Sequence, residues 1–182
     1  TGLPPHSLCR LGLGRTFQIN SIFSSARVLE NVQVALLAHR RRIWNMWAAA
    51  DKLLVREAEE LLTTLGLEDR AEKLGSELSY GDRRRLEVAL ALACEPQLLL
   101  LDEPTAGMSI PDKPGMVELI RKVSRERGVT VILIEHDMDI VFSVADEITV
   151  LHQGAVVAQG TPQEIKSNEQ VQQIYLGEDA DA

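Results

Sequence analysis

Long hydrophobic runs are missing from this 182-residue sequence. No stretch approaches the ~20 apolar residues that a membrane-spanning helix needs, and the first residues lack the basic-then-apolar layout of a secretory signal. We therefore expect a cytosolic chain. A surplus of positive charge is missing too, because 19 Lys and Arg stand against 27 Asp and Glu. The resulting formal charge of −8 argues against a nucleic-acid-binding surface spread over the protein.

Cysteine is scarce, with only two residues in the sequence. Cys9 and Cys94 lie far apart and match no paired spacing of metal ligands. Cys94 ends an apolar run that begins at Val88, which is typical of a buried thiol. The sequence therefore predicts no chemistry for either cysteine.

The hydrophobic content, 45%, is enough for one globular domain with a substantial core. Residues 28–94 follow a helical pattern, including an amphipathic stretch from about residue 48 that ends at Gly66, a common helix terminator. From residue 97 onward, strand-like runs (98–101, 129–134, 148–151) alternate with helical runs (111–127, 137–145). This alternation predicts a parallel sheet with helices on its faces.

The C-terminal part follows a different pattern. Gln153 and Gly154 separate two short apolar runs, which predicts a tight hairpin of antiparallel strands. Two short helices are predicted to follow, beginning at Thr161 and Asn168. The last residues, 178–182, are acidic and small, which is typical of a frayed end.

The most informative run is residues 97–104, in which four consecutive leucines are followed by Asp102, Glu103 and a proline. Such a run suits a strand buried on both faces of a parallel sheet, and ligands bind such sheets at the carboxyl ends of the strands. Taken alone, the run also fits an apolar element that ends in a solvated acidic turn.

Residues 78–82 precede a helical run and contain a predicted N-cap. Ser79 with Asp82 three residues later has the spacing of a capping box, worth about 1 kcal/mol without any ligand. The same geometry frees backbone N–H groups at a helix start, and Gly81 allows close approach, so the segment also fits a phosphate site. The position about twenty residues before the Asp102 strand end favours the phosphate interpretation.

Together, these segments resemble the ATP-binding subunits of ABC transporters. The matching motifs, in family order, are the Q-loop glutamine (Gln18), the signature motif (78–82), the Walker B strand (98–103), the D-loop (106–109) and the switch histidine (His136). Within the family, residues 15–18, 78–84, 102–108, 134–138 and 175–178 resemble the branched-chain amino acid importer subunits. Lipopolysaccharide-export ATPases share the closing Tyr-Leu-Gly-Glu, but the tyrosine and aspartate of the signature favour the importer type.

The resemblance implies a fold and a division of the chain. The fold is α/β, a P-loop NTPase-like ABC ATPase core with a parallel sheet and flanking helices, an inserted helical subdomain and its N-terminal strands absent. The implied parts are a Q-loop segment of the core (1–26), a helical subdomain ending in the signature helix (27–95), the Walker B, D-loop and H-loop part of the core (96–160), and C-terminal helices with a tail (161–182).

The resemblance also implies roles for the site residues. Asp102 would hold Mg²⁺ through water, because that ion prefers one or two protein carboxylates plus substrate oxygens. Glu103 would orient or deprotonate the water that attacks the γ-phosphate of ATP. His136 would hydrogen-bond the γ-phosphate or hold Glu103 and its water, and Gln18 would ligate Mg²⁺. The implied nucleotide contacts in the signature motif are Ser79, Tyr80, Gly81 and Asp82, which would face ATP held by a second subunit.

One motif of the family does not occur: none of the twelve glycines is followed by lysine, so there is no P-loop Gly-x-x-x-x-Gly-Lys. The P-loop supplies the backbone cradle and the lysine that bind the β/γ-phosphates. We therefore expect a truncated segment that hydrolyses no ATP by itself, while a full-length parent does so as a dimer. We also expect an open sheet edge beside the Asp102 strand.

The implied partners are a second ATP-binding subunit, transmembrane permease subunits and, indirectly, a periplasmic or extracellular solute-binding protein, with no nucleic acid. The expected location is the cytoplasmic face of the plasma membrane, as a peripheral subunit. Residues 39–47 combine basic and aromatic side chains, which fit either a nucleic-acid or membrane-surface contact or a solvated helical face with two tryptophans packed beneath it. The resemblance implies that this run lies in the helical subdomain that faces the transmembrane partner. The alternative functions are a lipopolysaccharide-export ATPase, a non-transport ABC protein and a non-catalytic regulatory cassette. Intact Glu103 and His136 argue against the last.

Overall fold

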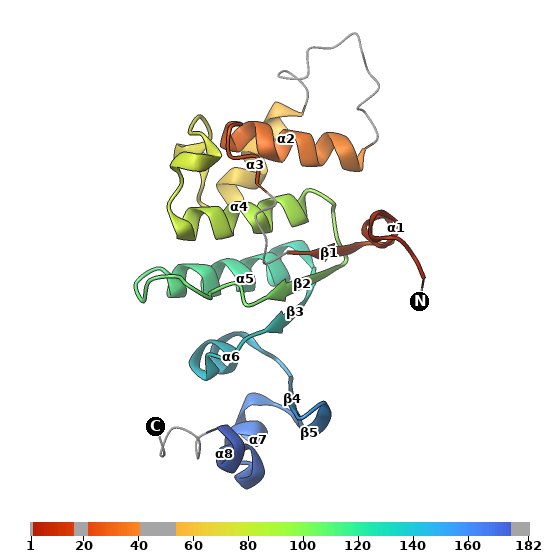
Figure 1. Cartoon of the computed structure of the whole chain (residues 1–182), viewed down its shortest axis with the longest axis vertical. Helices are drawn as coiled ribbons and strands as arrows, with labels where there is room; N and C mark the ends of the chain where they lie inside the picture. The colour runs from red at the N-terminus through yellow and green to blue at the C-terminus, as the bar shows by residue number, and fades with distance from the viewer. Residues whose placement is uncertain (1, 17–21, 41–53, 176–182) are drawn as a thin grey trace. The chain divides into compact units, whose positions relative to one another are not determined.

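The computed structural model describes residues 2–16, 22–40 and 54–175 (Figure 1). The chain folds into two compact units, Thr1–Glu135 and His136–Ala182. The first unit holds the sheet and most of the helices, and the second holds a hairpin with short helices.

The first unit contains a parallel sheet of three described strands in the order β1 (Leu13–Arg15), β2 (Leu98–Asp102), β3 (Thr130–Ile134). Asp102 lies opposite Ile134 in the register of β2 and β3. The parallel sheet predicted from the alternating runs is confirmed. The prediction of an open sheet edge beside β2 is wrong for the described sheet. Strands β1 and β3 flank β2, and these two outer strands are the edges.

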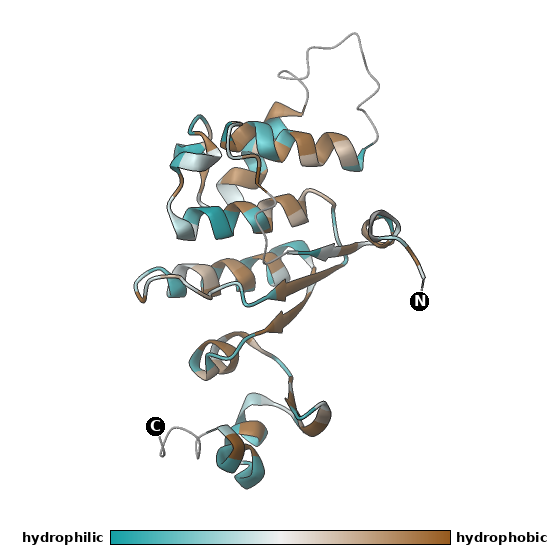
Figure 2. Cartoon of the chain, viewed as in Figure 1, coloured by the Kyte–Doolittle hydropathy of each residue, from teal (hydrophilic) through white to brown (hydrophobic). Residues whose placement is uncertain are grey.

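The first unit also contains helices, several of which cover one face of β2 and β3. They are α1 (Pro5–Arg10), α2 (Val28–His39), α3 (Val55–Thr64), the 3₁₀ turns η3 (Glu68–Arg70) and η4 (Gly75–Glu77), α4 (Tyr80–Leu92) and α5 (Lys113–Arg127). The helices α2, α3 and α4 pack on one another as one group (Figure 1). Figure 2 shows that β2 and β3 are hydrophobic along their length, while α4 changes from hydrophilic at its start to hydrophobic at its end. A single apolar cluster joins these helices to the sheet.

Local sequence explains where several helices begin and end. Ser79 caps α4 by accepting a hydrogen bond from the Asp82 N–H at 3.1 Å. Pro114 lies in the first turn of α5, where its missing N–H is not needed. Gly66 and Gly128 follow α3 and α5 in the left-handed conformation that ends helices. The predicted amphipathic helix is described from Val55 onward, because residues 41–53 lie outside the described part.

The four leucines of β2 are not equally buried. Leu99 and Leu101 are 1% and 0% exposed and belong to the apolar cluster shared with the helices. Leu98 and Leu100, on the opposite face, are only half-buried. The expectation of a strand fully buried on both faces therefore holds for one face of β2.

The second unit is built on an antiparallel hairpin. Strands β4 (Ile148–His152) and β5 (Ala155–Gly160) pair across Gln153 and Gly154, both with positive φ, as a tight hairpin turn requires. The short helices are α6 (Met138–Val144), α7 (Pro162–Lys166), which Thr161 caps, and α8 (Glu169–Tyr175). Tyr175 Oη donates to the Leu151 carbonyl at 2.8 Å and ties α8 to the hairpin. The predicted hairpin and both terminal helices are present.

No helix among the described residues is long and apolar enough to cross a lipid bilayer.

Candidate functional site

The carboxylates Asp102 and Glu103 lie at the carboxyl end of the central strand. Asp102 is partly exposed, and its carboxylate is 3.7 Å from the Arg15 guanidinium at the end of β1. The backbone N–H of Glu103 continues the ladder by donating to the Ile134 carbonyl at 2.9 Å. Ligands bind parallel sheets at the carboxyl ends of the strands, and both carboxylates lie at that end of β2.

The backbone of Glu103 is strained. Its φ of +46° lies in the left-handed region, which costs a residue with a side chain about 1–3 kcal/mol. The bond to Ile134 and a bond from the Ala106 N–H to the Glu103 carbonyl, 3.1 Å, hold this conformation. Such strain is concentrated at functional sites, because a fixed turn can aim a side chain where a relaxed one would not.

A third carboxylate, Glu135, anchors the turn that follows Glu103. The backbone N–H and the Oγ1 hydroxyl of the buried Thr105 both donate to Glu135 Oε1, at 3.0 and 2.6 Å. The other oxygen, Oε2, is buried and has no hydrogen-bond partner among the described residues. The end of β3 thus fixes the turn at the end of β2. Sequence reasoning assigned Glu135 no role, although its position directly after an apolar strand is the same signal that drew attention to Asp102.

His136 is the first residue of the second unit and follows Glu135 directly in the chain. The next residue, Asp137, caps α6 by accepting a bond from the Ile140 N–H at 3.4 Å. The approach of His136 to Glu103 stays a prediction.

The signature segment lies at the start of α4. The Ser79 hydroxyl makes the predicted N-cap bond, and the Asp82 carboxylate is 3.6 Å from the Arg70 guanidinium. Ser79 and Tyr80 are exposed, whereas Gly81 is buried. The predicted N-cap bond of Ser79 is therefore confirmed, and the phosphate interpretation stays a prediction that the exposed helix start permits.

The D-loop packs on this helix start. Gly107 has a φ of +74°, and a Cβ built there would lie 3.1 Å from the Tyr80 ring. A Cβ at Gly81 would lie 3.4 Å from the Met108 side chain. Tyr80 therefore occupies the space that a side chain at position 107 would need, and the two motifs are in contact within one chain.

Arg84 also contacts the Tyr80 side chain. Its guanidinium carbon lies 5.3 Å from the ring centroid, and Nη2 donates to Tyr80 Oη at 2.9 Å. Nη1 pairs with the buried Glu87 carboxylate at 2.9 Å. Burial by itself lowers the pKa of Arg84, but the hydrogen bond and charge of Glu87 outweigh it and raise that pKa above its ordinary value. The Tyr80 side chain is thus positioned by a permanently charged group.

Some predicted residues lie outside the described part of the chain. Gln18 is one, and the nearest described residue, Thr16, donates its N–H to the Leu100 carbonyl at 3.1 Å. Residues 41–47 are also outside, whereas Arg40 pairs with Glu57 at 2.6 Å and Glu95 at 2.9 Å. The tail residues 176–178 are outside as well.

Two family descriptions match this chain. The family described as "ABC transporter" matches residues 5–106, and the family described as "Branched-chain amino acid ATP-binding cassette transporter" matches residues 155–181. The first spans more than half of the chain.

Curated relatives and a solved structure agree. The high-affinity branched-chain amino acid transport ATP-binding protein BraF of Pseudomonas aeruginosa is 40% identical over 97% of this chain and 72% of BraF. The corresponding protein LivG of Escherichia coli is 36% identical over 97% of this chain and 72% of LivG. The crystal structure of the ADP conformation of MJ1267, an ATP-binding cassette of an ABC transporter, superposes with a TM-score of 0.81 at 26% identity, covering 97% of this chain and 73% of MJ1267. The chain therefore belongs to the family of ABC transporter ATP-binding cassettes.

Proposed function

We propose that this chain is the ATP-binding and ATP-hydrolysing part of an ABC transporter that imports branched-chain or related hydrophobic amino acids. The observation that carries the proposal is the identity of 36–40% over 97% of the chain with relatives named for branched-chain amino acid transport. The separate match of residues 155–181 to the branched-chain cassette family supports the same solute class.

The described carboxylates suit the magnesium ion that accompanies ATP in this proposal. Mg²⁺ takes oxygen ligands and is usually bound through one or two carboxylates plus waters and phosphate oxygens. Asp102 offers a partly exposed carboxylate at the ligand-binding edge of the sheet, and Gln18 would add an amide oxygen. When bound, the ion supplies charge neutralisation on the β- and γ-phosphates.

Glu103 is assigned as the residue that orients or deprotonates the attacking water. The fixed left-handed turn at Glu103 and the Thr105–Glu135 bonds would keep its carboxylate at one place on the sheet edge. His136, on the segment after β3, would hydrogen-bond the γ-phosphate or hold Glu103 and its water.

The signature residues are assigned to a second subunit's nucleotide. Ser79 and Tyr80 are exposed at the N-terminus of a 13-residue helix, whose free N–H groups and dipole attract phosphate. Asp82 would complete this surface, and the buried Gly81 is assigned as the residue that allows close approach of the phosphate to the backbone. The partners are therefore a second ATP-binding subunit and transmembrane permease subunits, with a solute-binding protein as an indirect partner, at the cytoplasmic face of the membrane.

The 182 residues contain no P-loop motif, because no glycine is followed by lysine. The cradle for the β/γ-phosphates is not supplied by these residues, so we expect them alone to show no ATP turnover. Turnover by the purified 182-residue chain would contradict this expectation.

The catalytic assignment is tested in the full-length protein that contains this chain. Glu103→Gln is expected to lower ATP turnover by about 10²–10⁴-fold, the usual contribution of a general base, while nucleotide-bound dimers persist. The matched control is Glu118→Gln on the exposed face of α5, which should turn over normally. Normal turnover by Glu103→Gln would remove Glu103 from the mechanism.

The solute class is tested by uptake. In cells that depend on this transporter, Glu103→Gln should abolish accumulation of labelled leucine and leave uptake through unrelated transporters unchanged. Unchanged leucine uptake, in a variant that has lost ATP turnover, would overturn the solute class and leave the ATPase assignment standing.

A further inference from the structure

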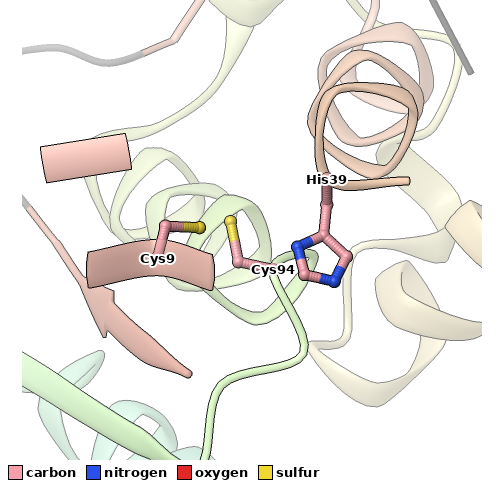
Figure 3. A group of neighbouring side chains, drawn as sticks. All are labelled: Cys9, His39 and Cys94. Carbon is pink, nitrogen blue, oxygen red and sulfur yellow. The ribbon is translucent and has the colours of Figure 1, made fainter. Parts of the chain in front are cut away.

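Two thiols and an imidazole from distant parts of the sequence meet in the first unit. Cys9 lies in the last turn of α1, His39 is the last residue of α2, and Cys94 follows the end of α4. Their sulfur and nitrogen atoms all lie within 4.8 Å of one another, and all three residues are half-buried. Figure 3 shows the two thiols pointing toward each other, with a ring nitrogen of His39 on the side that faces Cys94.

The donor set and its spacing fit one class of ligand. Two cysteines and a histidine with a fourth position open are a recurrent zinc ligand set. With Zn–S bonds of about 2.3 Å and Zn–N bonds of about 2.0–2.1 Å, the ligand atoms of a tetrahedral site lie about 3.5–3.8 Å apart. The separations of at most 4.8 Å therefore need side-chain rotations that move each atom by about 1 Å or less.

The surroundings also favour a cation. The helices α2 and α4 both end at this cluster, so their negative dipole ends lie beside it. The nearby cation, Arg40, is matched by two carboxylates: Glu57 at 2.6 Å and Glu95 at 2.9 Å. These two carboxylates offset the charge of Arg40 next to His39, while Arg10, the residue after Cys9, adds one positive charge.

We propose that Cys9, His39 and Cys94 form a binding site for a thiophilic divalent cation of the zinc class, with water in the fourth position. The ion would tie α1, next to the first strand of the sheet, to the group formed by α2, α3 and α4. Each ligand comes from a different helix end, so no short sequence spacing marks the site.

Cobalt spectroscopy tests the site directly. The reduced full-length protein is titrated with Co²⁺ and then with Zn²⁺ in competition with a chromophoric chelator. We expect one Co²⁺ per chain, with a near-ultraviolet thiolate-to-cobalt charge-transfer band that Zn²⁺ removes. Absence of this band in the folded protein would overturn the proposal.

Ligand variants locate the binding. We expect each of three variants to weaken zinc binding: Cys9→Ser, His39→Gln and Cys94→Ser. The loss should exceed about 10–100-fold, which is the cost of removing only a hydrogen bond to a metal ligand. His152→Gln, at the end of β4 in the other unit, is the control and should bind zinc as the unaltered protein does. Unchanged affinity in all three ligand variants would also overturn the proposal.

Folding and oxidation are controlled separately. Circular dichroism of each variant without metal shows whether the variant folds. If a variant does not fold, the cobalt band of the unaltered protein decides whether the metal site exists. If peptide mapping shows a Cys9–Cys94 disulfide and the reduced protein binds no Co²⁺, the pair is a redox pair and the metal site is wrong. None of these readouts depends on ATP turnover, so they test the metal site independently of the proposed function.

Discussion

Strands β2 and β3 are both five-residue apolar strands, paired residue for residue, yet they are buried very differently. In β2, Leu99 and Leu101 are 1% and 0% exposed, whereas in β3, Ile132 and Ile134 are 47% and 50% exposed. The two pairs lie on opposite faces of the sheet: Leu99 and Leu101 face the apolar cluster, whereas Ile132 and Ile134 are in register with Leu100 and Asp102 on the other face. On that other face the β2 side chains are half-buried because β2 lies between two strands, and the β3 side chains are exposed because β3 is an edge of the described sheet. Hydropathy therefore predicts that each segment forms a strand, and the neighbours decide how much of it is buried.

The ends of β2 and β3 also contribute differently to the candidate site. The end of β2 carries Glu103 in a strained left-handed turn, and the end of β3 carries Glu135, which accepts two hydrogen bonds from Thr105. The turn fixes the direction of the Glu103 side chain, and Glu135 stabilises that turn.

The largest expected effect distinguishes a buried position in β2 from an exposed position in β3. Leu101→Ala should lower the free energy of unfolding by about 2–5 kcal/mol, because it leaves a cavity in a closed core. Ile132→Ala, on the exposed face of β3, should cost less than about 1 kcal/mol. Urea denaturation of both variants measures the difference. Equal losses would show that β3 is covered by something other than the described residues.

An intermediate effect concerns the bond between the two strand ends. Thr105→Val removes one donor to Glu135 Oε1 and should lower the free energy of unfolding by about 1–3 kcal/mol. Thr130→Val, an exposed threonine at the start of β3, makes the same chemical change away from the turn. If both variants unfold at the same urea concentration, the Thr105 hydroxyl does not stabilise the turn.

The smallest expected effect concerns backbone strain at the end of β2. Glu103→Gly should be more stable than Glu103→Ala by about 1 kcal/mol, because glycine adopts a φ of +46° without strain and loses part of that gain to its greater unfolded-state freedom. Both variants lack the carboxylate and should lose turnover. Thermal unfolding compares the two, and an alanine variant as stable as the glycine variant would mean that the turn relaxes.

Local sequence was enough to predict most of the elements. The boundaries of β2 and β3, the hairpin at Gln153 and Gly154, and the Ser79 cap follow from short-range periodicity, turn residues and a hydroxyl at a helix start. Each of these signals lies within a few residues, where backbone geometry is set by the residues themselves.

The remaining features depend on contacts between distant residues. Thr105 and Glu135 are 30 residues apart, and nothing near either one shows that they meet. The convergence of Cys9, His39 and Cys94 depends on how three helix ends pack, so cysteine spacing gave no warning of it. The left-handed turn at Glu103 is held by a local bond from the Ala106 N–H and by a bond to Ile134 that exists only once the sheet has formed.

The contact between Tyr80 and Gly107 links two motifs that the sequence separates. The aromatic ring fills the space beside Gly107, and Arg84 contacts the same ring, so the start of α4 and residues 106–109 are packed together. A side chain added at position 107 would therefore force the Tyr80 ring out of its place and disturb the start of α4 as well.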